Sequence, residues 1–417
     1  MSTFPTFFVS AGEASGERYG ALLIAELRRR LAAAGSGAGF FGMGGPRMAE
    51  AGLDAVVRAE DMAVMGFTEV VGSLPRIYGE FRKLKQAIRR RRPDVAVLID
   101  FPEIHFRLAR EFHRLGVPVV YFVSPQLWAW KQHRIRLVKK YVRQMAVIFP
   151  FEERFYRERG VKAEFVGHPL ADLPLPSVSR EDFAAENKLD PARTWIGLLP
   201  GSRPKEIAAH LNEMLKAARL LEQAVSGSAH PQEKYEFIVP LAPTLSAAQR
   251  QDVFSRVNQQ AAGLAVRLAG DARATLLHAR ASIVASGTAT VEAALIGNPF
   301  VVVYRVSPVT YAIARRAVKV PHVAMANLIA GKRVVPELIQ HDFTAANIVQ
   351  QLQRLLPEGL ERQSMMNELA AIRHALSGRP ANGENNRDQG AIERVAAIVT
   401  RELEAVSLAK ELAEHPL

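Results

Sequence analysis

Three times along this chain of 417 residues, an apolar strand-like run leads into a Gly- and Ser-rich loop that opens a helix. The loops are Ser10–Gly16 (S-A-G-E-A-S-G), Leu199–Arg203 (L-P-G-S-R) and Ala285–Glu292 (A-S-G-T-A-T-V-E). Such a loop directs unpaired backbone N–H groups and the positive end of a helix toward one point, which suits phosphate. One loop lies in the first half and two in the second. This placement predicts two α/β domains facing each other across a cleft for a phosphorylated ligand.

Length and composition narrow the class of protein. A chain of 417 residues exceeds what one hydrophobic core usually serves, so two domains are expected. Its 48% hydrophobic and 23% charged residues are ordinary for a globular enzyme. It has no run of 18 uncharged apolar residues and no basic region typical of a signal peptide. Because cysteine is absent, disulfides and thiolate metal sites are excluded, which fits the cytoplasm.

The net charge of +12 is unevenly distributed. Residues 1–170 hold 27 Lys and Arg against 17 Asp and Glu, a net +10, and the excess gathers in 82–92 and 131–143. An anionic membrane surface or nucleic acid explains such a surplus, and a solvated basic helix face is the plain alternative. Nucleic acid is the weaker choice, because no aromatic-and-basic motif of the known nucleic-acid modules is present.

Apolar runs alternate with helical segments in both halves, which predicts parallel sheets covered on both faces. A Pro-rich linker, Gly167–Val178, separates the halves, and a polar stretch at Leu376–Gly390 is expected to be mobile. The expected strands are Thr6–Ser10, Gly39–Met43, Val95–Asp100, Pro118–Val123, Ala146–Phe149, Trp195–Leu199, Phe237–Pro240, Val266–Leu268, Ser282–Ala285 and Phe300–Tyr304. The expected helices include Tyr19–Leu31, Arg107–Leu115, Glu206–Ala224, Ala272–His278, Thr290–Ile296 and Ala391–Leu412.

The first loop carries a carboxylate. Gly12 and Gly16 allow close backbone approach, and Ser15 is a candidate cap for the following helix. The spacing is not G-x-G-x-x-G, so a nicotinamide cofactor is disfavoured. Glu13 projects from the loop, where a carboxylate suits a hydroxyl or a partner side chain better than phosphate. A tight strand–helix turn without further function is the alternative.

The two second-half loops suit a nucleoside diphosphate. Arg203 offers the guanidinium fork that matches a diphosphate, although a capped helix start is an alternative. Ser286, Gly287 and Thr288 stand where a helix begins, so N–H groups and hydroxyls converge there. Glu292 lies one helical turn beyond Thr288, where a carboxylate can take both hydroxyls of a ribose. The alternative is a capped helix with Glu292 on its solvated face.

Asp100 ends the apolar run V-A-V-L-I-D and precedes Phe101-Pro102. An ionisable group at the carboxyl end of a parallel strand lies where such sheets bind ligands, and burial raises its pKa toward working pH. Asp100 is therefore a general-base candidate, with a helix-capping carboxylate as the alternative. The eleven His show no H-x-x-x-H spacing, so no metal site is expected.

Two further segments combine apolar or aromatic residues with nearby basic ones. Val123–Trp130 (V-S-P-Q-L-W-A-W) brings two Trp close to a basic helix, which suits a sugar site, a membrane interface or simply a core cluster. Met62–Phe67 (M-A-V-M-G-F) is unusually apolar for a loop and suits either the binding of acylated ligands or a buried turn.

Taken together and in order, these motifs resemble those of the lipid-A-disaccharide synthases over nearly the whole chain. The set, beyond the three loops, consists of G-M-G-G-P-R-M (42–48), A-V-M-G-F-T-E-V (63–70), V-S-P-Q-L-W-A-W (123–130), F-P-F-E-E-R-F-Y (149–156), G-H-P-L (167–170) and N-L-I-A-G-K-R-V-V-P-E-L-I-Q (327–340).

The resemblance implies the GT-B architecture of two facing Rossmann-like domains. An acceptor-binding, membrane-facing domain would span 1–172 and a UDP-sugar-binding domain 173–376, with a mobile loop and C-terminal helix at 377–417 packing back on the first. It further implies a cofactor-free, metal-independent inverting glycosyltransferase of lipid A biosynthesis. Such an enzyme joins UDP-2,3-diacylglucosamine to 2,3-diacylglucosamine 1-phosphate (lipid X) through a β(1→6) bond and releases UDP.

The resemblance also implies roles for individual residues. Asp100 resembles the base that takes the proton from the acceptor's 6-hydroxyl, and Glu13 faces the reacting sugars as a second catalytic group. Residues of the UDP-sugar site are Ser202, Arg203, Ser286, Gly287, Thr288, Glu292, Asn327 and Gln340. Gly12, Ser15, Gly16 and Trp128 fall on the acceptor side, and Val64, Met65 and Phe67 at the membrane contact. A monomer or homodimer in the cytoplasm, peripherally attached to the inner face of the inner membrane of a Gram-negative bacterium, is expected.

The sequence departs from the family pattern at two places, and two other functions compete with the one that the resemblance implies. The family usually reads D-x-P-D-F-N where this chain reads D-F-P-E-I-H, so Glu103 and His105 replace Asp and Asn, and Ala326 stands where Pro is typical. A UDP-N-acetylglucosamine 2-epimerase would share the fold and nucleotide site without a lipid acceptor. A non-catalytic module that binds nucleotide sugar or lipid would not need Asp100.

Overall fold

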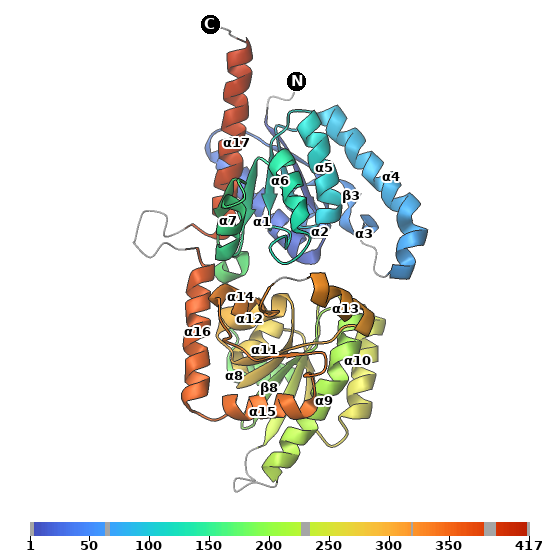
Figure 1. The fold of residues 1–417 in the computed structure, drawn as a ribbon, viewed down its shortest axis with the longest axis vertical. Helices are drawn as coiled ribbons and strands as arrows, with labels where there is room; N and C mark the ends of the chain where they lie inside the picture. The colour runs from blue at the N-terminus through green and yellow to red at the C-terminus, as the bar shows by residue number, and fades with distance from the viewer. Residues whose placement is uncertain (1–3, 63–66, 227–233, 318–319, 379–388, 415–417) are drawn as a thin grey trace. The chain divides into compact units, whose positions relative to one another are not determined.

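The computed structural model describes residues 4–62, 67–226, 234–317, 320–378 and 389–414. The chain forms two compact units, of which unit 1 joins Met1–Asp172 to Leu376–Leu417 and unit 2 is Leu173–Ala375. Figure 1 shows helices packed around a sheet in each unit. Both sheets are made of parallel strands, which confirms the predicted α/β class with two Rossmann-like units.

The sheet of unit 1 has seven strands in the order β3-β2-β1-β4-β5-β6-β7. From β1 the chain winds outward to β3 and then returns to add β4 to β7 on the other side, so the topological switch point lies between β1 and β4. The strands are β1 (Thr6–Ala11), β2 (Gly39–Gly44), β3 (Asp54–Arg58), β4 (Val95–Ile99), β5 (Val119–Phe122), β6 (Gln144–Val147) and β7 (Ala163–Phe165).

Helices cover both faces of this sheet because alternate strand residues point to opposite sides. In β1, Phe7 joins one buried cluster with Leu23 of α1 and Val399 of α17, and Phe8 joins the other with Phe112 of α5. The C-terminal helix α17 thus completes the core of unit 1. The helices are α1 (Ala14–Ala33), α2 (Pro46–Glu50), α3 (Ala59–Met62), α4 (Phe67–Arg91), α5 (Pro102–Arg114), α6 (Ile135–Tyr141), α7 (Pro150–Arg157) and α17 (Ala391–Glu414), with 3-10 turns η1 (Gln132–Arg134) and η2 (Pro169–Asp172).

The sheet of unit 2 repeats this winding with six strands in the order β10-β9-β8-β11-β12-β13, so its switch point lies between β8 and β11. The strands are β8 (Thr194–Leu199), β9 (Tyr235–Pro240), β10 (Val266–Ala269), β11 (Ala281–Ala285), β12 (Phe300–Tyr304) and β13 (Glu337–Ile339). The helices are α8 (Arg180–Asn187), α9 (Pro204–Ser226), α10 (Ala247–Gln260), α11 (Ala272–His278), α12 (Thr288–Ile296), α13 (Pro308–Ala317), α14 (Met325–Ala330), α15 (Ala345–Leu355) and α16 (Leu360–Leu376).

Each strand expected from the sequence is present, with small shifts at the ends. Three strands were not predicted, and all three are edge strands: β3 and β7 in unit 1 and β13 in unit 2. Edge strands are half solvated, so they lack the continuous apolar run that marks a central strand of a parallel sheet. Their burial is incomplete, whereas every residue of the central strand β4 is buried.

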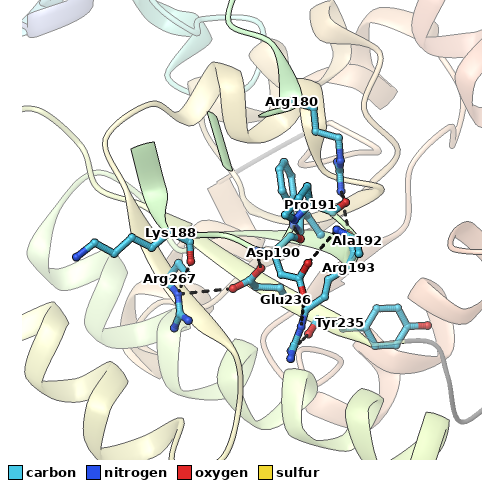
Figure 2. Close-up of polar contacts among 10 residues, drawn as sticks. Arg180, Lys188, Asp190, Pro191, Ala192, Arg193, Tyr235, Glu236 and Arg267 are labelled. Carbon is cyan, nitrogen blue, oxygen red and sulfur yellow. Dashed lines mark hydrogen bonds and ion pairs between the residues drawn. The ribbon is translucent and has the colours of Figure 1, made fainter. Parts of the chain in front are cut away.

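A polar network lies at the amino ends of β8, β9 and β10 (Figure 2). The buried carboxylate of Glu236 accepts a hydrogen bond from the backbone N–H of Asp190 (2.8 Å) and lies 3.6 Å from Arg267. Arg267 in turn donates to the carbonyl of Lys188 (3.0 Å). Because doubly wound sheets bind ligands at the carboxyl ends of their strands, this network at the opposite edge serves the fold of unit 2.

Two expectations concern residues that are only partly described. The stretch expected to be mobile, Leu376–Gly390, consists largely of residues 379–388, which lie outside the described residues. Among the residues that are described, no helix is both long and apolar enough to span a membrane.

Candidate active site

The first candidate site lies at the switch point of unit 1. Strands β1 and β4 are paired so that Ala11 lies opposite Ile99, and the next residues along each strand bring Glu13 and Asp100 to the same carboxyl edge. Burial raises the pKa of Asp100 to about 6, and the negative charge of Glu13 adds to the rise. The structure therefore brings together the two carboxylates to which the family resemblance gives catalytic roles, and burial gives Asp100 the pKa of a base that works near neutral pH.

The backbone at Asp100 is held in an uncommon conformation. Asp100 and Phe101 both have positive φ, 51° and 50°, although neither is glycine. The carbonyl oxygen of Asp100 lies 2.6 Å from the hydroxyl of Tyr121 and 2.5 Å from Nδ1 of His105. Phe101, and not Asp100, is the N-cap residue of α5, so the alternative of a helix-capping role for Asp100 is wrong.

Three contacts expected around the first loop need correction. The helix α1 begins at Ala14 with Glu13 as its N-cap, so Ser15 lies inside the first turn and does not cap it. A Cβ on Gly12 would lie 2.5 Å from the ring of Phe101, so this glycine makes room for a side chain, not for phosphate. A Cβ on Gly16 would meet its neighbours at 3.5 Å, an ordinary contact, so close backbone approach is not required there.

Trp128 belongs to the core and not to a sugar-binding surface. Its ring is buried, and its indole N–H donates to the carboxylate of Glu152 at 3.0 Å. Glu152 also accepts hydrogen bonds from two backbone N–H groups at the start of α7, and burial raises its pKa to about 7. Trp130, 42% exposed with the Lys131 ammonium 4.0 Å above its ring, is the tryptophan available to a ligand.

The two residues that depart from the family pattern both have partners. Glu103 accepts a two-pronged hydrogen bond from Arg134 (2.9 and 3.0 Å) and pairs with Lys131 at 3.2 Å. These bonds tie the start of α5 to the segment after β5. His105 is fully buried, and its Nε2 lies 2.8 Å from the hydroxyl oxygen of Ser10.

The second candidate site lies at the switch point of unit 2, where β8 leads into Pro200–Arg203. The backbone N–H groups of Ser202 and Arg203 donate to the carboxylate of Glu206 at 3.1 and 3.3 Å. The expectation that this loop presents unpaired N–H groups is therefore wrong for these two. Glu206 also lies 3.5 Å from the largely exposed guanidinium of Arg203.

The loop after β11 differs, because its N-cap residue is a glycine and the first turn of α12 contains no acidic residue. Gly287 is the N-cap residue of α12, and its φ of 155° favours glycine. The N–H groups of Thr288 and Ala289, the first two residues of the helix, cannot bond within it by geometry, whereas the N–H of Thr290 donates to the carbonyl of Gly287 at 3.1 Å. Gly287 and Thr288 are exposed and Ser286 is half-buried, while Glu292 is half-buried on the second turn. This loop fits the expected phosphate-binding start of a helix.

Asn327 is a buried structural residue. Its amide nitrogen donates to the Val335 carbonyl (3.0 Å) and the Glu337 carboxylate (2.8 Å), and its amide oxygen accepts from the N–H groups of Val334 (2.7 Å) and Val335 (2.9 Å). These four bonds use the capacity of the amide. The expected contact of this side chain with UDP is thus corrected to the anchoring of the segment before β13.

Gln340 follows β13 at the same carboxyl edge as the two loops of unit 2, since β8, β11, β12 and β13 are successive neighbours. Its φ is 55°, and its amide donates to the Val306 carbonyl at 3.2 Å. His210, which the sequence did not single out, connects this edge. Its Nδ1 lies 2.8 Å from the carbonyl of Pro200, and its Nε2 accepts from the N–H of Arg305 at 3.0 Å.

The remaining expectations concern membrane contact and metal binding. Val64 and Met65 lie outside the described residues, and Phe67 opens α4 without a described side chain. In the described part of the chain, no group of three His, Asp or Glu side chains is arranged to hold a metal ion.

Comparison with known proteins assigns the chain to a family. Residues 7–389 match the family described as lipid-A-disaccharide synthetase. The chain belongs to this family. It is 59% identical over 390 residues to the lipid-A-disaccharide synthase of Acidobacterium capsulatum, covering 90% of this chain and 93% of that protein. It is 48% identical over 392 residues to that of Koribacter versatilis, covering 94% and 97%. Membership of the lipid-A-disaccharide synthetase family makes the chain a glycosyltransferase.

Solved structures share the fold at low sequence identity. The kitacinnamycin glycotransferase has a TM-score of 0.60 at 14% identity, covering 96% of this chain and 99% of that one. A putative UDP-N-acetylglucosamine 2-epimerase from Listeria monocytogenes has a TM-score of 0.58 at 12% identity, covering 97% and 98%. Because transferases and epimerases share this fold, the fold does not choose between them. The lipid-A-disaccharide synthetase match does, and it disfavours the epimerase alternative.

Proposed function

We propose that this chain transfers the diacylglucosaminyl group of UDP-2,3-diacylglucosamine to the 6-hydroxyl of 2,3-diacylglucosamine 1-phosphate, with inversion at the anomeric carbon. The observation that supports this mechanism is the position of Asp100 at the switch point of unit 1, where burial raises its pKa to about 6. In the proposed step the acceptor oxygen forms a bond to the anomeric carbon and its proton passes to Asp100. The bond from that carbon to the β-phosphate oxygen breaks, and the electron pair leaves with UDP.

Glu13 assists this step without exchanging a proton. Its carboxylate is exposed at the N-cap of α1, beside Asp100. An ionised carboxylate accepts hydrogen bonds from sugar hydroxyls, and its charge keeps Asp100 more basic. We assign Glu13 to holding the acceptor sugar and maintaining the basicity of Asp100.

The helix starts of unit 2 differ in their acidic residues, and this difference supports one of them as the diphosphate site. Backbone N–H groups directly before α9 and α14 already donate to a carboxylate, that of Glu206 and that of Glu337 respectively. The first turn of α12, which begins at Thr288 after Gly287, contains no acidic residue. We therefore assign the diphosphate to the start of α12 and to Arg203, and the ribose hydroxyls to Glu292. Positive groups at this position stabilise the charge that develops on the leaving diphosphate.

The membrane contact is a separate part of the proposal. Its support is the net +10 of residues 1–170, since an anionic lipid surface attracts such a charge. We propose peripheral attachment to an anionic membrane by a monomer or homodimer. Replacing Met65 and Phe67 by Ser is expected to reduce cosedimentation with anionic vesicles. Cosedimentation at the level of the unaltered chain would contradict the proposal.

The decisive experiment supplies both substrates and detects the disaccharide by mass. The unaltered chain is expected to form it, and Asp100→Asn is expected to lose turnover while its affinity for UDP stays within about twofold. Asp252→Asn, on the surface of α10, is the matched control. Turnover by Asp100→Asn at the unaltered rate would remove Asp100 from the mechanism. Conversion of a UDP-sugar without acceptor would indicate an epimerase.

A further inference from the structure

His105 uses both of its ring nitrogens in the interior of unit 1. Nδ1 lies 2.5 Å from the Asp100 carbonyl oxygen and Nε2 lies 2.8 Å from the Ser10 hydroxyl oxygen. A carbonyl oxygen only accepts, so Nδ1 must carry the proton and Nε2 must accept from Ser10. The hydroxyl of Tyr121 donates to the same carbonyl at 2.6 Å. The carbonyl of Asp100 thus receives two donors, one from α5 and one from β5.

These two donors act on a strained part of the backbone. Two consecutive residues, Asp100 and Phe101, have positive φ, and such a conformation persists only when the surroundings hold it. The carbonyl that receives both donors belongs to the peptide unit that joins these residues. Its orientation is coupled to the direction in which the Asp100 side chain leaves the main chain.

We propose that His105 is a positioning residue for the transfer reaction, in which its Nδ1–H fixes the Asp100 carbonyl and thereby the direction of the Asp100 carboxylate. Ser10 selects the tautomer that makes this possible. The proposal rests on the proposed role of Asp100 as base. Burial also lowers the pKa of His105 to about 4, so the ring stays neutral, with one proton, over the pH range in which Asp100 is ionised.

Two amide substitutions separate the two nitrogens of the ring. The amide nitrogen of Asn lies near the position of Nδ1, and that of Gln reaches toward the position of Nε2. His105→Gln is expected to lower kcat about 10- to 100-fold, because misplacement of a catalytic group by about 1 Å has such an effect. His105→Asn is expected to recover most of that loss. The affinity for UDP is expected to stay the same in both variants, since its proposed site is in unit 2.

The control is His113→Gln, because His113 is exposed at the end of the same helix and contacts no residue of this network. Its kcat is expected to equal that of the unaltered chain. Equal kcat values for folded His105→Gln and His105→Asn would overturn the proposal. A variant that raises KM and leaves kcat unchanged would overturn it as well.

A second variant keeps the test independent of the histidine. Tyr121→Phe removes the other donor to the Asp100 carbonyl and conserves the shape of the ring, and it is expected to lower kcat about tenfold with unchanged UDP affinity. An unchanged kcat would overturn the proposal even if His105→Gln fails to fold. Loss of activity in Asp100→Asn together with normal kcat in these variants would remove only the positioning role. Full activity of Asp100→Asn would instead remove the proposed base.

Discussion

The carboxylates of Glu13 and Asp100 follow two paired strands of unit 1, and the charge of Glu13 adds to burial in raising the pKa of Asp100 to about 6. Each is the first carboxylate after its strand, one in a loop that opens α1 and one in a loop that opens α5. Burial, with the nearby charge of Glu13 as the smaller cause, gives Asp100 the pKa of a useful base near neutral pH.

The rate of transfer is expected to fall below about pH 6, because only the ionised form of Asp100 accepts a proton. Glu13→Gln removes a negative charge and so lowers the pKa of Asp100, which moves the acid limb of kcat/KM to lower pH. Glu17→Gln is the control, since Glu17 on the same helix is bonded to the N–H of Arg47 at 2.9 Å. A limb that does not move in Glu13→Gln would contradict the pairing.

The raised pKa of Asp100 also makes the free energy of unfolding depend on pH. The folded state binds the proton more tightly than the unfolded state, so the free energy of unfolding falls as pH rises from about 4 to 6. A shift from 3.8 to about 6 corresponds to roughly 3 kcal/mol as an upper value. Asp100→Asn is therefore expected to raise Tm at pH 8 and to leave it unchanged at pH 4, as measured by calorimetry. A lower Tm at pH 8 would show that the carboxylate stabilises the fold.

Gly12 and Gly16 are expected to differ when each is replaced by Ala. A Cβ on Gly12 would lie 2.5 Å from the Phe101 ring, so Gly12→Ala is expected to cost about 1–3 kcal/mol and to lower kcat. Gly16 is in α1 with room for a methyl group, so Gly16→Ala is expected to gain up to about 1 kcal/mol. Urea unfolding measures both. Equal effects would refute the assignment of Gly12 to packing with Phe101.

Trp128 and Trp130 are likewise expected to differ in how much their replacement by Phe lowers the free energy of unfolding. Trp128→Phe leaves the buried carboxylate of Glu152 without its indole donor, so the free energy of unfolding is expected to fall by about 1–3 kcal/mol at pH 8. Trp130→Phe, at an exposed position, is expected to change it by less than about 0.5 kcal/mol. Thermal unfolding compares the two. A normal Tm for Trp128→Phe would speak against a core role.

Asn327→Ala is expected to destabilise unit 2, because four hydrogen bonds, two of them fully buried, lose their partner, at about 1–3 kcal/mol for each buried group left unsatisfied. Gln340→Ala removes one side-chain bond at a half-buried position and is expected to affect stability less. Chemical unfolding measures the loss of stability in each variant, and UDP titration measures whether its nucleotide binding changes. A stable Asn327→Ala variant with weakened UDP binding would restore Asn327 to the nucleotide site.

Part of the site could be predicted because the sequence shows where the central strands end. Asp100 follows five consecutive buried residues of β4, and the loop at Gly287 follows five of β11. An apolar run that ends in a polar residue indicates the carboxyl edge of a parallel sheet. The edge strand β13 lacked that signal, so the position of Gln340 on the same edge came from the motif and not from a predicted strand.

Other roles depended on contacts between residues far apart in the sequence. The aromatic pattern around Trp128 is the same for a core cluster and a sugar-binding surface, and only the packing of α7 against it places Glu152 at its indole N–H. By contrast, the bonds from the N–H groups of Ser202 and Arg203 to Glu206 span only four and three residues. The sequence left this helix cap open as an alternative, since a Glu in the first helical turn is equally common on a solvated surface.

The sequence by itself determined the α/β class, the central strands and the three loops at their ends, because hydrophobic runs and glycines act locally. Tertiary structure decided which loop groups are already satisfied and which remain for a ligand. It placed Glu13 beside Asp100, Phe101 over Gly12 and His105 between Ser10 and the Asp100 carbonyl. Hydrogen bonds and desolvation depend on distances across the sheet, and those distances exist only after strands β1 and β4 have paired.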